Sequence, residues 1–220
     1  MSNHTAKLEK IRQLIPAIAF QEGLCETAPP PVHRSCRPFY FDAPEFGRID
    51  QMLDIGGGPG YVASLLKEEH PPIRITVFDL PPVCDRALDI FRESGQGAEL
   101  GAHAGDFFHD PFPTGFRAMQ FSHVLELFTP DRIGLLLKKS FDALPRNGRL
   151  LVYGQASAAN EEPPAVQQAP TFPFQALALP AGISVRYSAE QYLYWLRLVG
   201  FSTVTCRQDA SARIFLAAWK

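Results

Sequence analysis

Cysteine is scarce in this 220-residue sequence, and its spacing excludes the usual cysteine chemistries. The four cysteines are Cys25, Cys36, Cys84 and Cys206. None lies in a C-x-x-C pair and no histidine joins them at zinc-ligand spacing, so the sequence predicts no metal site. Thiols scattered in this way are typical of a reducing compartment, which favours a cytoplasmic protein.

Long apolar runs and an excess of basic charge are also missing. The N-terminal stretch MSNHTAKLEKIRQLIPAIAF mixes charges with apolar residues, unlike a signal peptide, and no later stretch approaches a membrane span. Lys and Arg number 21 against 23 Asp and Glu, a formal net charge of −2. A protein that grips phosphate backbones normally has a basic face. We therefore expect neither a membrane nor a nucleic acid as partner.

The residues that are present are those of a globular α/β domain. Hydrophobic residues make up 46% and charged residues 20% of the chain, enough for a large core. From residue 50 onward, short β-branched and aromatic runs alternate with segments of helical spacing. The pattern predicts strands at 52–55, 73–78, 98–104, 117–125, 149–153, 201–206 and 213–219, and helices at 60–69, 83–92, 130–144 and 188–200. This order predicts a doubly wound, mostly parallel seven-stranded sheet that ends in an antiparallel hairpin at its edge.

The residues that precede this alternation have a different character. Residues 6–22 have helical spacing, and 28–48 are rich in proline, which predicts an irregular connection. We interpret 1–48 as a short N-terminal helical and irregular cap, and 49–220 as the ligand-binding domain. Within that domain, a short helix is predicted at 172–179.

A glycine-rich turn follows the first predicted strand, as DIGGGPG at 54–60. Glycines there permit positive φ angles and a close approach of ligand to backbone. The turn lies at the carboxyl end of a strand, where open α/β sheets bind ligands, and Asp79 ends the next strand, where a carboxylate can accept hydrogen bonds from a ribose. The structural alternatives are a tight turn without a ligand and an aspartate that caps a helix. A nicotinamide dinucleotide normally needs G-x-G-x-x-G. Here Pro59 and Gly60 replace that spacing and Ala63 stands where the third glycine or alanine would fall, so this motif alone leaves dinucleotide binding open and the rest of the chain decides against it.

Four motifs in the same order resemble those of the bacterial and plant small-molecule O-methyltransferases. They are LDIGGGPG at 53–60, FDLPPV at 78–83, GDFF at 105–108 and GRLLVYGQ at 148–155. The segment YSAEQYLYWLRLVGF at 187–201 is similar to the last helix-to-strand junction of that family. The resemblance covers about residues 49–220 and implies a class I methyltransferase fold that binds S-adenosylmethionine across the carboxyl ends of the strands.

The resemblance also implies roles for individual residues. Asp79 would hold the ribose, with Leu80 against the adenine, while Asp106 would bind the adenine amino group and Phe107 would stack on the ring. An acid beside an aromatic after a strand suits a purine, although such phenylalanines are also common in cores. The remaining expected cofactor-binding residues are Asp54, Gly56, Gly58 and Gly60 around the turn, and Phe121 in the fourth strand.

Two features depart from the family pattern. The family carries a longer N-terminal segment that dimerises and helps to build the acceptor pocket, so here the pocket would be smaller, more open or capped by residues 1–48. Glu126 stands where the family has its catalytic histidine, and His123 lies three residues earlier. We take both as catalytic candidates, together with Tyr40, whose ring could face the sulfonium. The alternatives are an exposed glutamate, a packed histidine and ordinary packing of an N-terminal arm.

The sequence therefore predicts a transferase that uses S-adenosylmethionine to methylate a small metabolite, as a monomer or homodimer. Amino-acid or secondary-metabolite chemistry is what the resemblance implies. Two alternatives stay open. One is a cyclase that closes S-adenosylmethionine to azetidine-2-carboxylate and methylthioadenosine without an acceptor, which would need no histidine base. The other is a subunit that binds the cofactor without catalysis.

Overall fold

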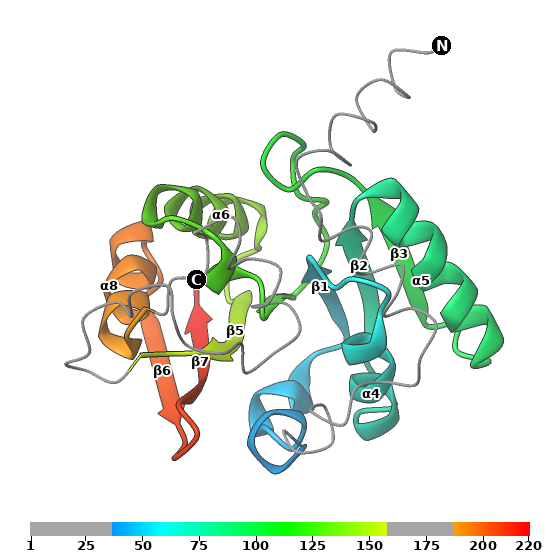
Figure 1. The fold of residues 1–220 in the computed structure, drawn as a ribbon, viewed down its shortest axis with the longest axis horizontal. Coiled ribbons are helices and arrows are strands. Elements are labelled where there is room, and N and C mark those ends of the chain that lie inside the picture. The colour runs from blue at the N-terminus through cyan, green and yellow to red at the C-terminus, as the bar shows by residue number, and fades with distance from the viewer. Residues whose placement is uncertain (1–36, 158–186) are drawn as a thin grey trace, which may run out of the picture.

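A seven-stranded sheet runs through the described part of the chain, residues 37–157 and 187–220, in the computed structural model (Figure 1). Its strands lie close to the ranges that the sequence predicts. They are β1 (Gln51–Ile55), β2 (Arg74–Asp79), β3 (Leu100–Ala104), β4 (Ala118–Ser122), β5 (Arg149–Gln155), β6 (Thr203–Gln208) and β7 (Arg213–Trp219). The predicted α/β fold class is thus confirmed.

The strand order brings the carboxyl ends of several parallel strands to one edge of the sheet. The order is β3-β2-β1-β4-β5-β7-β6. The first five are mutually parallel, whereas β7 pairs antiparallel with both β5 and β6. The predicted terminal hairpin is present, but β7 lies inside the sheet and β6 forms its edge. Because parallel strands end on the same side, the turns after β1, β2, β3 and β4 meet at the carboxyl edge, and the strand order reverses beside β1.

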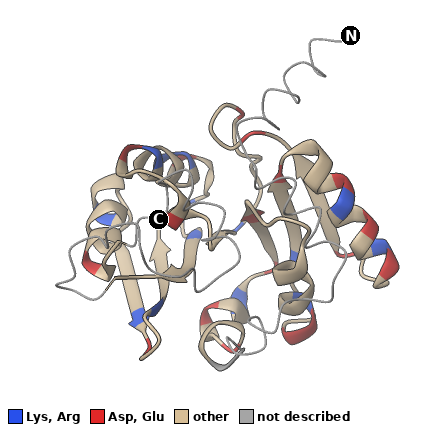
Figure 2. Ribbon diagram, viewed as in Figure 1, with Lys and Arg blue, Asp and Glu red and all other residues tan. Residues whose placement is uncertain are grey.

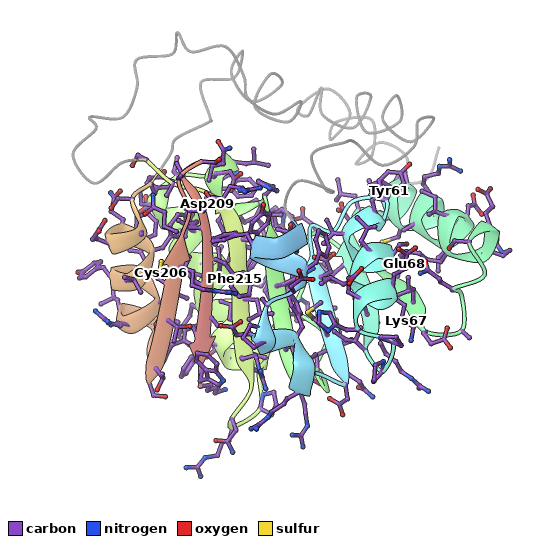
Figure 3. All side chains as sticks on the ribbon, turned by 90° about the horizontal axis from the view of Figure 1, so that it is seen from below. Tyr61, Lys67, Glu68, Cys206, Asp209 and Phe215 are labelled. Carbon is purple, nitrogen blue, oxygen red and sulfur yellow. The ribbon has the colours of Figure 1, made fainter. Side chains whose placement is uncertain are left out.

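Helices cover both faces of the sheet, as a doubly wound fold requires. The helices are α4 (Tyr61–Glu69), α5 (Pro81–Glu93), α6 (Pro130–Ala143) and α8 (Ala189–Val199). One buried cluster joins α6 and α8 to the sheet, and a second joins α4, α5 and the two short turns η1 (Arg37–Phe41) and η2 (Pro44–Arg48) to the opposite face. Alternation along β1 divides the clusters, because Met52 belongs to the second and Leu53 to the first. Figure 3 shows α4 and the β6–β7 hairpin toward opposite ends of the sheet.

Local sequence signals account for where the helices begin and end. Pro81 and Pro130 occupy the first turns of α5 and α6, where a missing amide hydrogen costs nothing. Ser188 caps α8 through a reciprocal pair of hydrogen bonds with Gln191, and Gly200 ends the helix at φ 120°. These signals fix where the helices begin and end.

The structure differs from the sequence prediction at the fourth strand and near the N-terminus. β4 ends at Ser122 rather than at residue 125, because His123 has a φ of 57° and turns the chain into the short helical turn η3 (Leu125–Leu127). Residues 37–48, expected to be irregular, form η1 and η2. The helices predicted at 6–22 and 172–179 lie outside the described residues, and the domain boundary near residue 48 stays a prediction.

Charged residues of both signs are interspersed along the helices (Figure 2). Along α5, for example, the sequence alternates in sign at Asp85, Arg86, Asp89 and Arg92. Within the described ranges, no helix combines the length and the apolar character needed to cross a membrane.

Candidate functional site

The turn after β1 depends on glycine. Gly56, Gly58 and Gly60 have φ angles of 71°, 59° and 83°, a backbone conformation that side chains rarely adopt. The Gly56 amide donates to the Phe78 carbonyl at 2.8 Å, which fastens the turn to β2. A Cβ atom on Gly60 would come within 2.3 Å of the buried Phe91 ring. The turn is therefore held in one conformation by both its backbone and the packing beneath it.

Asp79 closes the other side of the turn. Its carboxylate accepts hydrogen bonds from the Gly58 amide at 2.9 Å and from the Leu80 amide at 2.7 Å. Burial raises the pKa of Asp79 to about 6, and the two amide donors offset part of the rise. The residue predicted to bind ribose thus lies at the carboxyl edge, directly against the glycine turn. Leu80 is half-buried and precedes the first residue of α5.

Asp54 lies beneath the turn and is fully buried. Burial raises its pKa to about 7; the neighbouring Gln120 side chain lowers the value in part, although the geometry falls short of a hydrogen bond, and the charge of Asp79 raises it further. A Cβ atom on Gly57 would lie 2.6 Å from one carboxylate oxygen. Among the described residues, neither oxygen has a hydrogen-bond partner. Two buried carboxylates therefore flank a single turn.

Tyr40 connects the N-terminal turn η1 to this region. Its hydroxyl donates to Gln120 Oε1 at 2.5 Å, and its ring stacks on Tyr153 with centroids 4.3 Å apart. The side chain is buried with Phe46 and Phe215 in the cluster shared with α4 and α5. The structure thus gives Tyr40 a packing role, and its predicted catalytic role stays a prediction. Gln120, a polar residue inside an apolar strand, is a neighbour of Asp54 that the sequence analysis missed.

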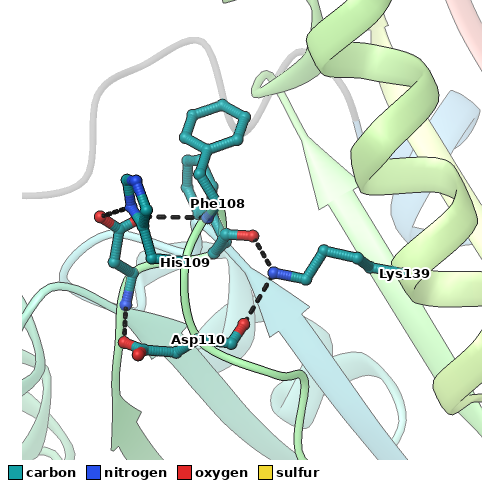
Figure 4. Close-up of polar contacts among 6 residues, drawn as sticks. Phe108, His109, Asp110 and Lys139 are labelled. Atoms are coloured by element: carbon teal, nitrogen blue, oxygen red, sulfur yellow. Dashed lines mark hydrogen bonds and ion pairs between the residues drawn. The ribbon is translucent and has the colours of Figure 1, made fainter.

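The loop after β3 carries Asp106 and Phe107 (Figure 4). Asp106 accepts from the Phe108 amide at 2.9 Å and pairs with His109 Nδ1 at 2.7 Å. Partial burial alone would raise the pKa of Asp106, but these hydrogen bonds outweigh it and lower the pKa, so the group is an ionised acceptor at neutral pH. A Cβ atom on Gly56 would lie 3.6 Å from the Phe107 ring. The loop and the glycine turn are therefore neighbours, as the predicted cofactor site requires.

His123 and Glu126 form a close pair at the end of β4. His123 Nδ1 lies 2.8 Å from Glu126 Oε1, and both side chains are largely buried. The glutamate lies over Gly154 of β5, where a Cβ atom would come within 2.2 Å of Oε2, so only glycine leaves room for it. Val124 lies between these two residues in the sequence, and its side chain would be 2.9 Å from a Cβ atom on Gly56. The pair predicted from the sequence is thus brought together beside the glycine turn.

Phe121 is a core residue of β4. It is fully buried in the cluster shared with α6 and α8. Its predicted contact with the cofactor stays a prediction. Across residues 37–157 and 187–220, no three His, Cys, Asp or Glu side chains gather as metal ligands would.

Comparisons with known proteins point to one family. A model of the O-methyltransferase domain matches residues 36–202. The L-tyrosine C(3)-methyltransferase of Streptomyces lavendulae is 30% identical over 70% of this chain and 42% of its own length. The 3-hydroxy-5-methyl-1-naphthoate 3-O-methyltransferase of Streptomyces sahachiroi is 30% identical over 74% of this chain and 46% of its own length. The chain thus spans somewhat less than half the length of these two relatives.

Solved structures agree with the sequence matches. The S-adenosylmethionine-dependent methyltransferase SibL, in its apo form, aligns with a TM-score of 0.72 at 26% identity, over 85% of this chain and 55% of SibL. Human N-acetylserotonin methyltransferase in complex with SAM has the same TM-score at 22% identity, over 91% of this chain and 55% of the human one, a likeness of fold. The motifs, the sheet order and the matched residues together show that this chain belongs to the O-methyltransferase domain family.

Proposed function

We propose that this protein binds S-adenosylmethionine at the carboxyl edge of its sheet and transfers the methyl group to a small aromatic metabolite. The observation that carries the proposal is the glycine turn fastened to Asp79, with the Asp106 loop beside it. The two Streptomyces relatives, named as methyltransferases of tyrosine and of a naphthoate, support this class of acceptor. S-adenosylmethionine supplies an activated methyl group on a sulfonium.

The residues present fit that cofactor. The glycines of the turn put no side chain between its backbone and a ligand. The buried carboxylate of Asp54, whose oxygens have no hydrogen-bond partner among the described residues, suits a cationic group close to the turn. Asp79 can accept hydrogen bonds from ribose hydroxyls. The ionised Asp106 can accept one from an exocyclic amine, and Phe107 offers a ring face for stacking.

The His123–Glu126 pair is our candidate for the base that removes the proton from the acceptor. A carboxylate only accepts hydrogen bonds, so Glu126 fixes the tautomer in which His123 Nδ1 carries the hydrogen. Nε2 then holds the lone pair that can take a proton from a phenol. Glu126 would act through the histidine as a positioning residue, and the pair would supply the base that the family pattern places at residue 126.

Finer features follow the same reasoning. We propose that the acceptor belongs to secondary metabolism, that the protein acts in the cytoplasm as a monomer or homodimer, and that residues 1–48 cap the acceptor pocket. The free thiols of Cys84 and Cys206 support a reducing compartment.

The test is incubation of the purified protein with S-adenosylmethionine, with and without a panel of phenols, aromatic amines and aromatic carboxylic acids. Mass spectrometry of the small molecules then separates the readings. S-adenosylhomocysteine formed together with a methylated acceptor supports the proposal. Methylthioadenosine formed without an acceptor would contradict methyl transfer and indicate cyclisation instead. The names of the related methyltransferases give no support to cyclisation.

A further inference from the structure

Lys139 reaches from α6 to the loop that carries Asp106 and Phe107 (Figure 4). Its ammonium donates to the Phe107 carbonyl at 2.5 Å and to the Asp110 carbonyl at 2.7 Å. The same nitrogen lies 4.7 Å from the centre of the Phe112 ring. One side chain thus contacts the loop at its start, at its end and at the aromatic residue that follows it.

The loop has its own hydrogen bonds, but these leave two carbonyls for the lysine. The amides of His109 and Asp110 donate to the Asp106 carbonyl, and the Asp106 amide donates to the Asp110 carboxylate. Those bonds close a tight turn and leave the Phe107 and Asp110 carbonyls pointing at α6. Burial lowers the pKa of Lys139, while the carboxylates of Asp106 and Asp110 raise it and offset part of the loss. The Lys139 ammonium thus holds this acidic turn through two carbonyl oxygens.

A single peptide bond links the Lys139 ammonium to the Asp106 carboxylate. The bond between Phe107 and Phe108 gives its carbonyl to Lys139 and its amide hydrogen to Asp106 Oδ1. Because a peptide group is planar, fixing the carbonyl also fixes the direction of the amide on the opposite side. Lys139 thereby sets where Asp106 Oδ1 lies, although the two side chains form no direct hydrogen bond. The same peptide carries the Phe107 ring, which lies against the glycine turn.

We propose that Lys139 is a positioning residue that sets the adenine selectivity of the cofactor site through the Phe107–Phe108 peptide. This rests on the proposed function, since it deepens the recognition of S-adenosylmethionine. Without the lysine, the peptide is held only on its amide side, by the bond from the Phe108 amide to Asp106 Oδ1, and the direction in which the carboxylate faces the 6-amino group is less firmly fixed. The loss falls on discrimination between purines rather than on the ribose or the methionine portion.

The chain offers a matched control in the preceding residue. Lys138 is also a lysine of α6, but within the described part of the chain its ammonium pairs with Asp142 on the exposed side of the helix and does not contact the Asp106 loop. We compare Lys139→Met and Lys138→Met with the wild type. Each protein is titrated calorimetrically with S-adenosylhomocysteine and with S-inosylhomocysteine, in which an oxygen replaces the 6-amino group. Circular dichroism and melting temperature confirm the fold.

The expected result is a change in the ratio of the two dissociation constants. Wild type and Lys138→Met prefer the adenine ligand, whereas Lys139→Met loses about tenfold in that preference, the scale of one charge-assisted hydrogen bond. A general loosening of the fold would weaken the binding of both ligands equally and leave the ratio of the two dissociation constants unchanged. If Lys139→Met does not fold, Lys139→Leu, which also lacks a donor, is judged by the same ratio.

An unchanged ratio in a folded Lys139 variant overturns the inference and leaves the proposed function intact. If the wild type binds neither ligand, the proposed function and the inference fail together. If the wild type binds both with equal affinity, only the inference fails.

Discussion

At the scale of single residues, three aspartates near the same edge have different electrostatic environments. Asp54 and Asp79 are buried, and burial raises their pKa values to about 7 and about 6. Asp106 is less buried and receives hydrogen bonds that lower its pKa. The same side chain therefore suits different tasks: Asp106 is an ionised acceptor, whereas the two buried groups gain most from a cation or from donors placed beside them.

A pH-dependent stability follows for Asp54. In an unfolded chain an aspartate has a pKa of about 3.9. The folded protein therefore binds more protons than the unfolded chain between about pH 4 and the raised pKa of about 7, so its free energy of unfolding falls as pH rises through that window. Asp54→Asn removes this term. In urea unfolding from pH 4.5 to 8, the wild type should lose stability relative to Asp54→Asn with a slope of up to roughly 1.4 kcal/mol per pH unit.

Asp79 is present in both proteins, so the difference between the two curves reports Asp54 together with its coupling to Asp79. If the two stability curves run parallel across this pH range, Asp54 does not bind a proton on folding, and burial does not raise its pKa as described.

The His123–Glu126 pair yields a kinetic prediction. His123→Asn removes the base, and asparagine tolerates the left-handed φ of 57° at this position. We expect kcat to fall by about 100-fold or more, with the affinity for S-adenosylhomocysteine changed little. Glu126→Gln keeps the shape but removes the charge. It should lower kcat by about 10- to 100-fold, the scale of losing a partner that orients a histidine.

The double variant is the control for joint action. Because both residues serve one proton transfer, it should be no slower than His123→Asn alone. Near-normal turnover by a folded His123→Asn enzyme would exclude the pair as the base.

At the scale of elements, the sequence predicted what local patterns determine. The strands, the glycine turn, the capped start of α8 at Ser188 and the placement of Asp79 all follow from periodicity and short motifs. The end of β4 does not, because the left-handed conformation of His123 depends on its amide hydrogen bond to Tyr153 in another strand. Gln120 and Tyr40 meet across 80 positions, and Lys139 contacts the Phe107 and Asp110 carbonyls across 32 and 29 positions. Such contacts form only in the folded chain and leave no local signal.

The glycine turn yields a stability prediction at this scale. Gly60 and Gly95 both have positive φ angles, 83° and 73°, so alanine costs a similar backbone strain of about 1–2 kcal/mol at each. A Cβ on Gly60 also meets the Phe91 ring at 2.3 Å, whereas nothing lies within 4 Å at Gly95. Gly60→Ala should therefore lose about 1–3 kcal/mol more than Gly95→Ala in chemical unfolding. Equal losses would mean that the ring is not packed beneath the turn.

At the scale of the whole molecule, the topology makes the site. β1, β2, β3 and β4 are separated along the chain by α4, α5 and loops, yet their carboxyl ends meet at one edge because all four run parallel. The turn, Asp79, the Asp106 loop and the His123–Glu126 pair each come from a different strand. No single segment contains the site, which is why the ordered set of motifs predicted the family better than any one of them.

The most direct measurement of cofactor binding is a calorimetric titration of the wild type and Asp79→Ala with S-adenosylhomocysteine at neutral pH. The wild type should bind one equivalent. A folded Asp79→Ala variant should bind more weakly by about 1–3 kcal/mol, the scale of lost hydrogen bonds to a charged group. If the folded wild type shows no binding, or if the variant binds as tightly as the wild type, the cofactor does not lie at this edge of the sheet in the way proposed.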